Sequence, residues 1–162
     1  MAFAGHLLVN GIDGESQDQG FDKHIDVLHY SMGVSNPPSM LGGGFSAGKA
    51  TASDFSFSLA QGSSSTKLEE FCVSGKHIDT VTLKLSKSIG DPQELQEYMT
   101  VTFTDCFISS AQEGAGGDVP IDSVSIAYSQ KKVEYKEQKT AGGALTLAAS
   151  YGWDFKKNAK AA

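Results

Sequence analysis

Apolar residues alternate with polar or small residues in six segments, and this two-residue period constrains the fold more than any other feature. The apolar positions are Phe55, Phe57 and Leu59; Val81, Leu83 and Leu85; Met99, Val101 and Phe103; Val124, Ile126 and Tyr128; Val133 and Tyr135; and Leu145, Leu147 and Ala149. Successive side chains of a strand point to opposite faces, so this period indicates strands with one buried face. The chain also carries 18 glycines, which suit the turns between short strands. We therefore expect a mainly β fold, a compact β-barrel of two packed antiparallel sheets.

One segment departs from this period and predicts a single short α-helix over about residues 66–74, flanking the barrel. Thr66 is a candidate N-cap, Glu69 stands three residues later as its capping-box partner, and Gly75 supplies a stop. The helix is too short to be stable alone. We expect it to dock an apolar stripe that includes Phe71 on the sheet.

Length and charge narrow the class of protein. The 162 residues contain no linker or internal repeat, so residues 1–162 are expected to form a single domain. Apolar residues make up 40% and charged residues 20%, a composition that favours neither disorder nor membrane insertion. The formal net charge of -6 argues against nucleic acid as a partner, because phosphate binding needs a basic face.

The N-terminus Met1–His6 lacks the basic and apolar regions of a cleaved signal peptide. We expect the protein to be cytoplasmic during assembly. Any secretion to the extracellular space or into a target cell would then use a route that does not read such a signal.

A long extended loop is expected over about residues 36–52. It carries Met40, Leu41 and Phe45, which a solvated linker would normally avoid. These three residues predict an arm that packs on a neighbouring molecule, as an oligomer or stacking interface, with plain disorder as the alternative.

The same loop contains a fragment of a phosphate-binding motif. Gly43–Lys49 fits the first seven positions of a P-loop, but the eighth must be Ser or Thr and is Ala50. The segment also leads toward a predicted strand and not a helix, whose N-terminus would hold the phosphate. We predict no nucleotide and no other cofactor.

Catalytic and metal-binding patterns are weak throughout. The acidic run Asp13–Asp18 lacks the glycine and glutamate of a calcium loop and predicts a solvated turn. The four histidines have no metal-ligand spacing, so no metal site is expected; they are His6, His24, His29 and His77. No Gly-x-Ser-x-Gly motif occurs. We expect no catalytic residues and no enzyme activity, although the members of a catalytic triad can lie far apart in sequence.

Three further residues are expected to serve packing. Cys72 and Cys106 lie among apolar residues and predict two reduced, buried thiols. Trp153, the only tryptophan, predicts a core or interface anchor in preference to a ligand-stacking residue.

Several segments, in order along the chain, resemble the haemolysin-coregulated protein (Hcp) family, the tube proteins of the type VI secretion system. They are Asn10–Ser16, His24–Ser35, Gly42–Lys49, Asp54–Phe57, Ser74–Ile78, Phe107–Ser110, Val124–Tyr128, Ala141–Gly143 and Tyr151–Asp154. The chain departs from the family pattern at His29 and Met32, in the charged run Thr66–Glu70, and in a long approach from Ala144 to Ser150. These departures affect local contacts and partner specificity more than the fold.

The resemblance implies a β-barrel with one flanking helix, six copies of which close into a ring. Such hexamers stack into a tube inside a contractile sheath, assembled on a baseplate and capped by a spike protein. Small effector proteins are carried in the ring lumen, and the tube itself is exported when the machine fires. Ser31 is the counterpart of the serine that faces the lumen in relatives, so it is the expected effector-binding residue.

Two other classes stay open from the residues alone. A bacteriophage-type tail tube protein would share ring and tube assembly. A small β-barrel enzyme or ligand-binding protein would instead be a monomer with a deep pocket.

Overall fold

The computed structural model describes residues 4–40, 42–89, 94–139 and 143–161. Thirteen strands and one helix follow one another along these residues. The strands are β1 (Ala4–Val9), β2 (Ile25–Val27), β3 (His29–Ser31), β4 (Val34–Ser35), β5 (Pro38–Ser39), β6 (Ser46–Ala47), β7 (Thr51–Ala52), β8 (Phe55–Ala60), β9 (Ile78–Ile89), β10 (Glu94–Gly114), β11 (Ile121–Gln138), β12 (Leu145–Asp154) and β13 (Ala159–Lys160), and the helix is α1 (Ser63–Ser74). The mainly β architecture with antiparallel sheets and one short helix is confirmed.

The strand pairings make a closed circuit. Strand β1 pairs with β9, β9 with β10, β10 with β11, β11 with β8, and β8 with β3, all antiparallel. The circuit returns to β1 because β3 continues from β2, which pairs with β1. Leu28, between β2 and β3, donates its backbone N–H to the Ser58 carbonyl (2.9 Å). A sheet closed in this way leaves few open edges in the barrel.

Strand β11 belongs to two parts of the molecule. Its residues 121–126 pair with β8 inside the barrel, whereas residues 130–138 pair with β12 beyond it. Strand β12 in turn pairs with the short β13. In the second part the expected burial fails: Tyr135 is 44% exposed, Leu147 is 59% exposed and Ala149 is exposed. In this part of the sheet, the alternating apolar residues do not pack against another layer.

Aromatic side chains fill the centre of the barrel. Phe55 and Phe103 are fully buried and stacked with ring centroids 4.8 Å apart, and Phe57 stacks on Phe55 at 5.5 Å. Burial of each such side chain contributes about 1.5–3 kcal/mol. The alternating residues of β8, β9 and the first part of β11 therefore form the core as predicted.

The helix begins three residues earlier than expected. Its N-cap is Gly62, whose backbone N–H donates to the Ser65 hydroxyl (3.1 Å). Thr66 lies inside the helix, so its assignment as N-cap with a Glu69 capping box is wrong. The predicted end is confirmed, because Gly75 takes the left-handed conformation (φ 63°) that favours glycine and closes the last turn.

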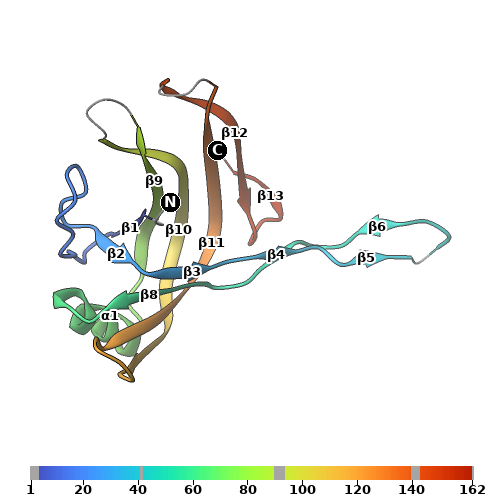
Figure 1. Cartoon of the computed structure of the whole chain (residues 1–162). Coiled ribbons are helices and arrows are strands. Elements are labelled where there is room, and N and C mark those ends of the chain that lie inside the picture. Colours follow the sequence, from blue (N-terminus) through green and yellow to red (C-terminus); the bar gives the residue numbers. More distant parts are fainter. Residues whose placement is uncertain (1–3, 41, 90–93, 140–142, 162) are drawn as a thin grey trace.

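Residues 34–52 form an arm that projects away from the barrel (Figure 1). The predicted extended loop is more regular than expected, because two short ladders join β4 to β7 and β5 to β6. The hydroxyls of Ser35 and Thr51 lie 2.9 Å apart across the first ladder. The Gly-rich segment Gly43–Lys49 therefore leads into strands and not into a helix.

Candidate functional site

Small hydroxyl side chains cover one face of the barrel, which we call the serine face: Ser31, Ser56, Ser58, Ser123 and Ser125. Cross-strand pairing places these residues in two rows. Ser31 of β3 lies opposite Ser56 of β8, which lies opposite Ser125 of β11. The next row is His29, Ser58 and Ser123. The face is polar because the alternate residues of the same strands point into the aromatic core.

Hydrogen bonds of the serine side chains link the neighbouring strands of this face. The hydroxyls of Ser56 and Ser125 lie 2.9 Å apart. Ser109, on β10, donates to the Asp54 carboxylate (2.6 Å) at the start of β8, and its hydroxyl also lies 3.1 Å from the Ser125 carbonyl. Ser31 at the edge of the face is exposed.

The arm presents apolar side chains away from the core. Met40 is 70% exposed and Phe45 is 76% exposed. Leu41, the third predicted interface residue, lies outside the described residues. Exposed apolar groups of this size on a projecting hairpin are typical of a contact with another chain.

The structure brings together one set of metal-type ligands that the sequence did not indicate. The Nε2 atom of His6 lies 2.6 Å from Asp18 and 3.5 Å from Asp26. His6 is buried against the ring of Phe21, with centroids 3.9 Å apart, whereas both carboxylates are exposed. His6 and Asp26 are cross-strand partners, and Asp18 reaches them from the turn that covers β1. This geometry is that of a histidine that forms one hydrogen bond, to Asp18, with the Asp26 carboxylate nearby.

His77 and His24 contact oxygen atoms of neighbouring residues, and the two cysteines differ in burial. His77 bonds to Asp105, and His24 contacts the Asp22 carbonyl at 3.0 Å. Burial, with a smaller effect of the neighbouring Asp105 charge, raises the pKa of the Cys106 thiol to about 12, whereas Cys72 is half-buried. A thiol with so high a pKa is a poor nucleophile.

The motif around Trp153 ends β12 and forms the following turn. Trp153 is half-buried and lies opposite Lys131 of β11. The buried Asp154 carboxylate accepts hydrogen bonds from the backbone N–H groups of Lys156 (3.0 Å) and Lys157 (2.9 Å). The turn then leads into β13. The motif therefore allows the chain to turn back, so that β13 pairs with the end of β12.

Comparisons with known proteins agree with this architecture. The sequence model of the family described as "Type VI secretion system effector, Hcp" matches residues 6–135. A curated relative, Protein hcp1 of Pseudomonas aeruginosa, is 34% identical over 164 residues, covering 99% of this chain and 100% of the relative.

Solved structures give the same result. One, titled "Structure of a type six secretion system protein", has a TM-score of 0.89 at 29% identity and covers 99% of this chain and 100% of its own. Hcp1 from Salmonella typhimurium has a TM-score of 0.78 at 28% identity, with coverage of 99% and 100%.

This mainly antiparallel β fold with one helix is shared with the solved structures above, and the matched sequence model specifies the family. The chain belongs to the Hcp family of the type VI secretion system. That family is a structural, secreted one and not a family of enzymes. In the part of the chain that the structure describes, no helix has the length and apolar character needed to cross a bilayer.

Proposed function

We propose that this protein is the tube subunit of a type VI secretion system. Six copies close into a ring, the rings stack into a tube inside the contractile sheath, and the spike and baseplate bound its ends. The serine face lines the lumen and carries small effector proteins, with Ser31 at the cargo surface. Assembly takes place in the cytoplasm, and firing exports the tube.

The observation that carries this proposal is the arm. Met40 and Phe45 are 70% and 76% exposed on a hairpin that leaves the barrel, so they contribute nothing to the core of their own chain. Among residues 34–52 the sole charged residue is Lys49, and the arm therefore presents a mostly uncharged, partly apolar surface. Contact with a neighbouring subunit would remove that surface from water, which favours assembly by about 25 cal/mol per Å² of apolar area.

The test compares the wild type with a Met40→Ser, Phe45→Ser variant. Sedimentation velocity and electron micrographs of the wild type should detect a six-membered ring. The variant should shift toward smaller species or unstacked rings, because its arm has lost apolar area. Its circular dichroism should stay that of the wild type, since neither residue packs in the barrel.

A wild type that remains monomeric over a wide concentration range would contradict ring formation. Unchanged assembly of the variant would instead leave the ring and remove the arm from its interface. A Ser39→Ala variant on the same arm serves as the control, because it alters little apolar area.

A further inference from the structure

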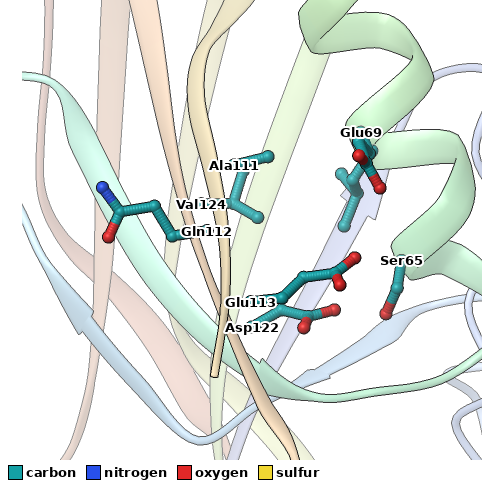
Figure 2. Close-up of a pocket in the computed structure, with 8 residues that line it drawn as sticks. Ser65, Glu69, Ala111, Gln112, Glu113, Asp122 and Val124 are labelled. Atoms are coloured by element: carbon teal, nitrogen blue, oxygen red, sulfur yellow. The ribbon is translucent and has the colours of Figure 1, made fainter.

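A small hollow lies between helix α1 and the paired ends of β10 and β11, where its lining residues alternate along β11 with those of the serine face. Its volume is about 220 Å³. It is lined by Ser65, Leu68, Glu69, Ala111, Gln112, Glu113, Asp122 and Val124. Figure 2 shows the carboxylates of Glu113 and Asp122 side by side, pointing toward Ser65 on the helix, with Glu69 farther along it.

Three carboxylates meet at this hollow without a cation. Among the residues that the structure describes, no lysine or histidine forms an ion pair with Glu69, Glu113 or Asp122. Asp122 is 4% exposed, and its Oδ1 atom is buried without a hydrogen-bond partner. An unpartnered polar atom at such a depth is costly, and the carboxylate that carries it lines the hollow.

The carboxylates at the hollow repel one another. The charge of Glu69, and after it that of Asp122, raises the pKa of Glu113. Ser65 lies in the first turn of α1, and the positive end of the helix dipole there offsets part of this repulsion. A positive group between the carboxylates would relieve the rest.

The shape of the hollow selects the kind of cation. The described ligand atoms that gather within 4.8 Å of one another in groups of three are those of His6, Asp18 and Asp26, at another site. The three carboxylates at the hollow do not form such a compact group. Leu68, Ala111 and Val124 add an apolar wall, against which an aliphatic stem can pack while its charged end meets the acids.

We propose that this hollow binds a lysine or arginine side chain of a partner protein. The aliphatic stem packs on Leu68, Ala111 and Val124, and the ammonium or guanidinium group donates hydrogen bonds to Asp122 and Glu113, with Glu69 at the mouth. All eight lining residues belong to one chain. The site is therefore complete in each subunit and does not depend on ring assembly.

Saturation-transfer difference NMR tests this on the purified full-length protein, because the method reports weak ligands of large assemblies. The probe is N-acetyl-lysine methylamide, and its norleucine counterpart has the same stem without the charge. The lysine probe should give a saturable signal on its side-chain methylene protons, and the norleucine probe should not. Either Glu113→Gln or Asp122→Asn should weaken binding about tenfold, the effect of losing one hydrogen bond to a charged group.

Matched variants on the helix separate this site from general attraction to an acidic protein. Glu69→Gln should weaken binding, whereas Glu70→Gln, the next residue with the same change of charge, should leave it as in the wild type. Glu113→Gln keeps the test valid if Asp122→Asn fails to fold, because Glu113 is exposed.

Three results would overturn the proposal. The first is a signal that Glu69→Gln and Glu70→Gln weaken equally. The second is binding of 1,5-diaminopentane without binding of the lysine probe, which would assign the hollow to free polyamines. The third is saturable Ca²⁺ binding that Glu113→Gln removes while the lysine probe stays silent.

Discussion

Asp105 has a backbone conformation that few residues adopt. Its φ angle is 59°, in the left-handed region, and the pairs Thr104–Gln130 and Cys106–Tyr128 stand on either side of it in the β10–β11 ladder. The carboxylate bonds to His77 and accepts a hydrogen bond from the Ser129 hydroxyl (3.0 Å). Asp and Asn tolerate this region better than other non-glycine residues. The residue therefore joins β9, β10 and β11 at one point.

These contacts predict an acid-dependent part of the stability. The hydrogen bond with His77, and after it that with Ser129, lowers the pKa of Asp105. A carboxyl whose pKa is lower in the folded protein stabilises the fold at neutral pH, and this stability is lost as the pH falls through the folded value. Replacing Asp105 by Asn keeps a residue that tolerates the backbone and removes the titration.

We expect the Asp105→Asn variant to be less stable than the wild type at pH 7, and the difference to shrink below about pH 4. Urea unfolding at a series of pH values measures it. Asp118→Asn, in the turn after β10, is the control. A difference that stays constant down to about pH 2 would show that Asp105 does not act through its charge.

At the scale of elements, the helix depends on the rest of the molecule at its start and along one face. The carboxylate of Glu15 accepts a hydrogen bond from the backbone N–H of Ser63 (3.1 Å), from a turn 48 residues earlier in the chain. Phe71 is 5% exposed and packs in the core, whereas Val73 on the same helix is 80% exposed.

These two positions give a prediction on stability with a matched control. Phe71→Ala should lower the free energy of unfolding by about 3–5 kcal/mol, because it leaves a cavity under the helix. Val73→Ala should change it by about 0.5 kcal/mol or less. Urea denaturation of both variants measures these changes. Equal losses of unfolding free energy in the two variants would mean that α1 does not dock through Phe71.

For the molecule as a whole, the serine face, the arm and the acidic hollow point in different directions from the barrel. The arm projects from the barrel (Figure 1), whereas the serine face and the acidic hollow share the same stretch of β11. Ser123 and Ser125 alternate there with Asp122 and Val124, so the two sets point to opposite sides of the strand. Ser31 is exposed on β3, where its side chain makes little contribution to folding.

We predict that Ser31→Gln leaves ring formation unchanged but lowers retention of a small effector from the same secretion system. The larger amide would alter the contact surface of the lumen. A pull-down of the effector measures retention, and sizing of the same sample measures the ring. Normal retention would exclude Ser31 from the cargo surface, and loss of rings would place it in a packed interface.

The sequence by itself determined six strand segments, which lie in β8 to β12, and the buried face of β8, β9 and the first part of β11. Alternation of apolar residues is a local property, so Phe55, Leu83 and Ile126 could be assigned to the core without any partner strand. The helix end at Gly75 is equally local, because glycine adopts the left-handed conformation at no steric cost. The family resemblance, carried by short segments in order, added ring and tube assembly as expectations.

Only the tertiary structure decided where those strands pair and what the pairing brings together. The exposed face of Tyr135 and Leu147 has the same period as a buried one, and it differs only because no layer covers β12. The helix start at Ser63 depends on Glu15, and the hollow of Glu69, Glu113 and Asp122 joins a helix to two strands. Such contacts join residues far apart in the chain, and the local pattern that specifies a strand carries no information about its distant neighbours.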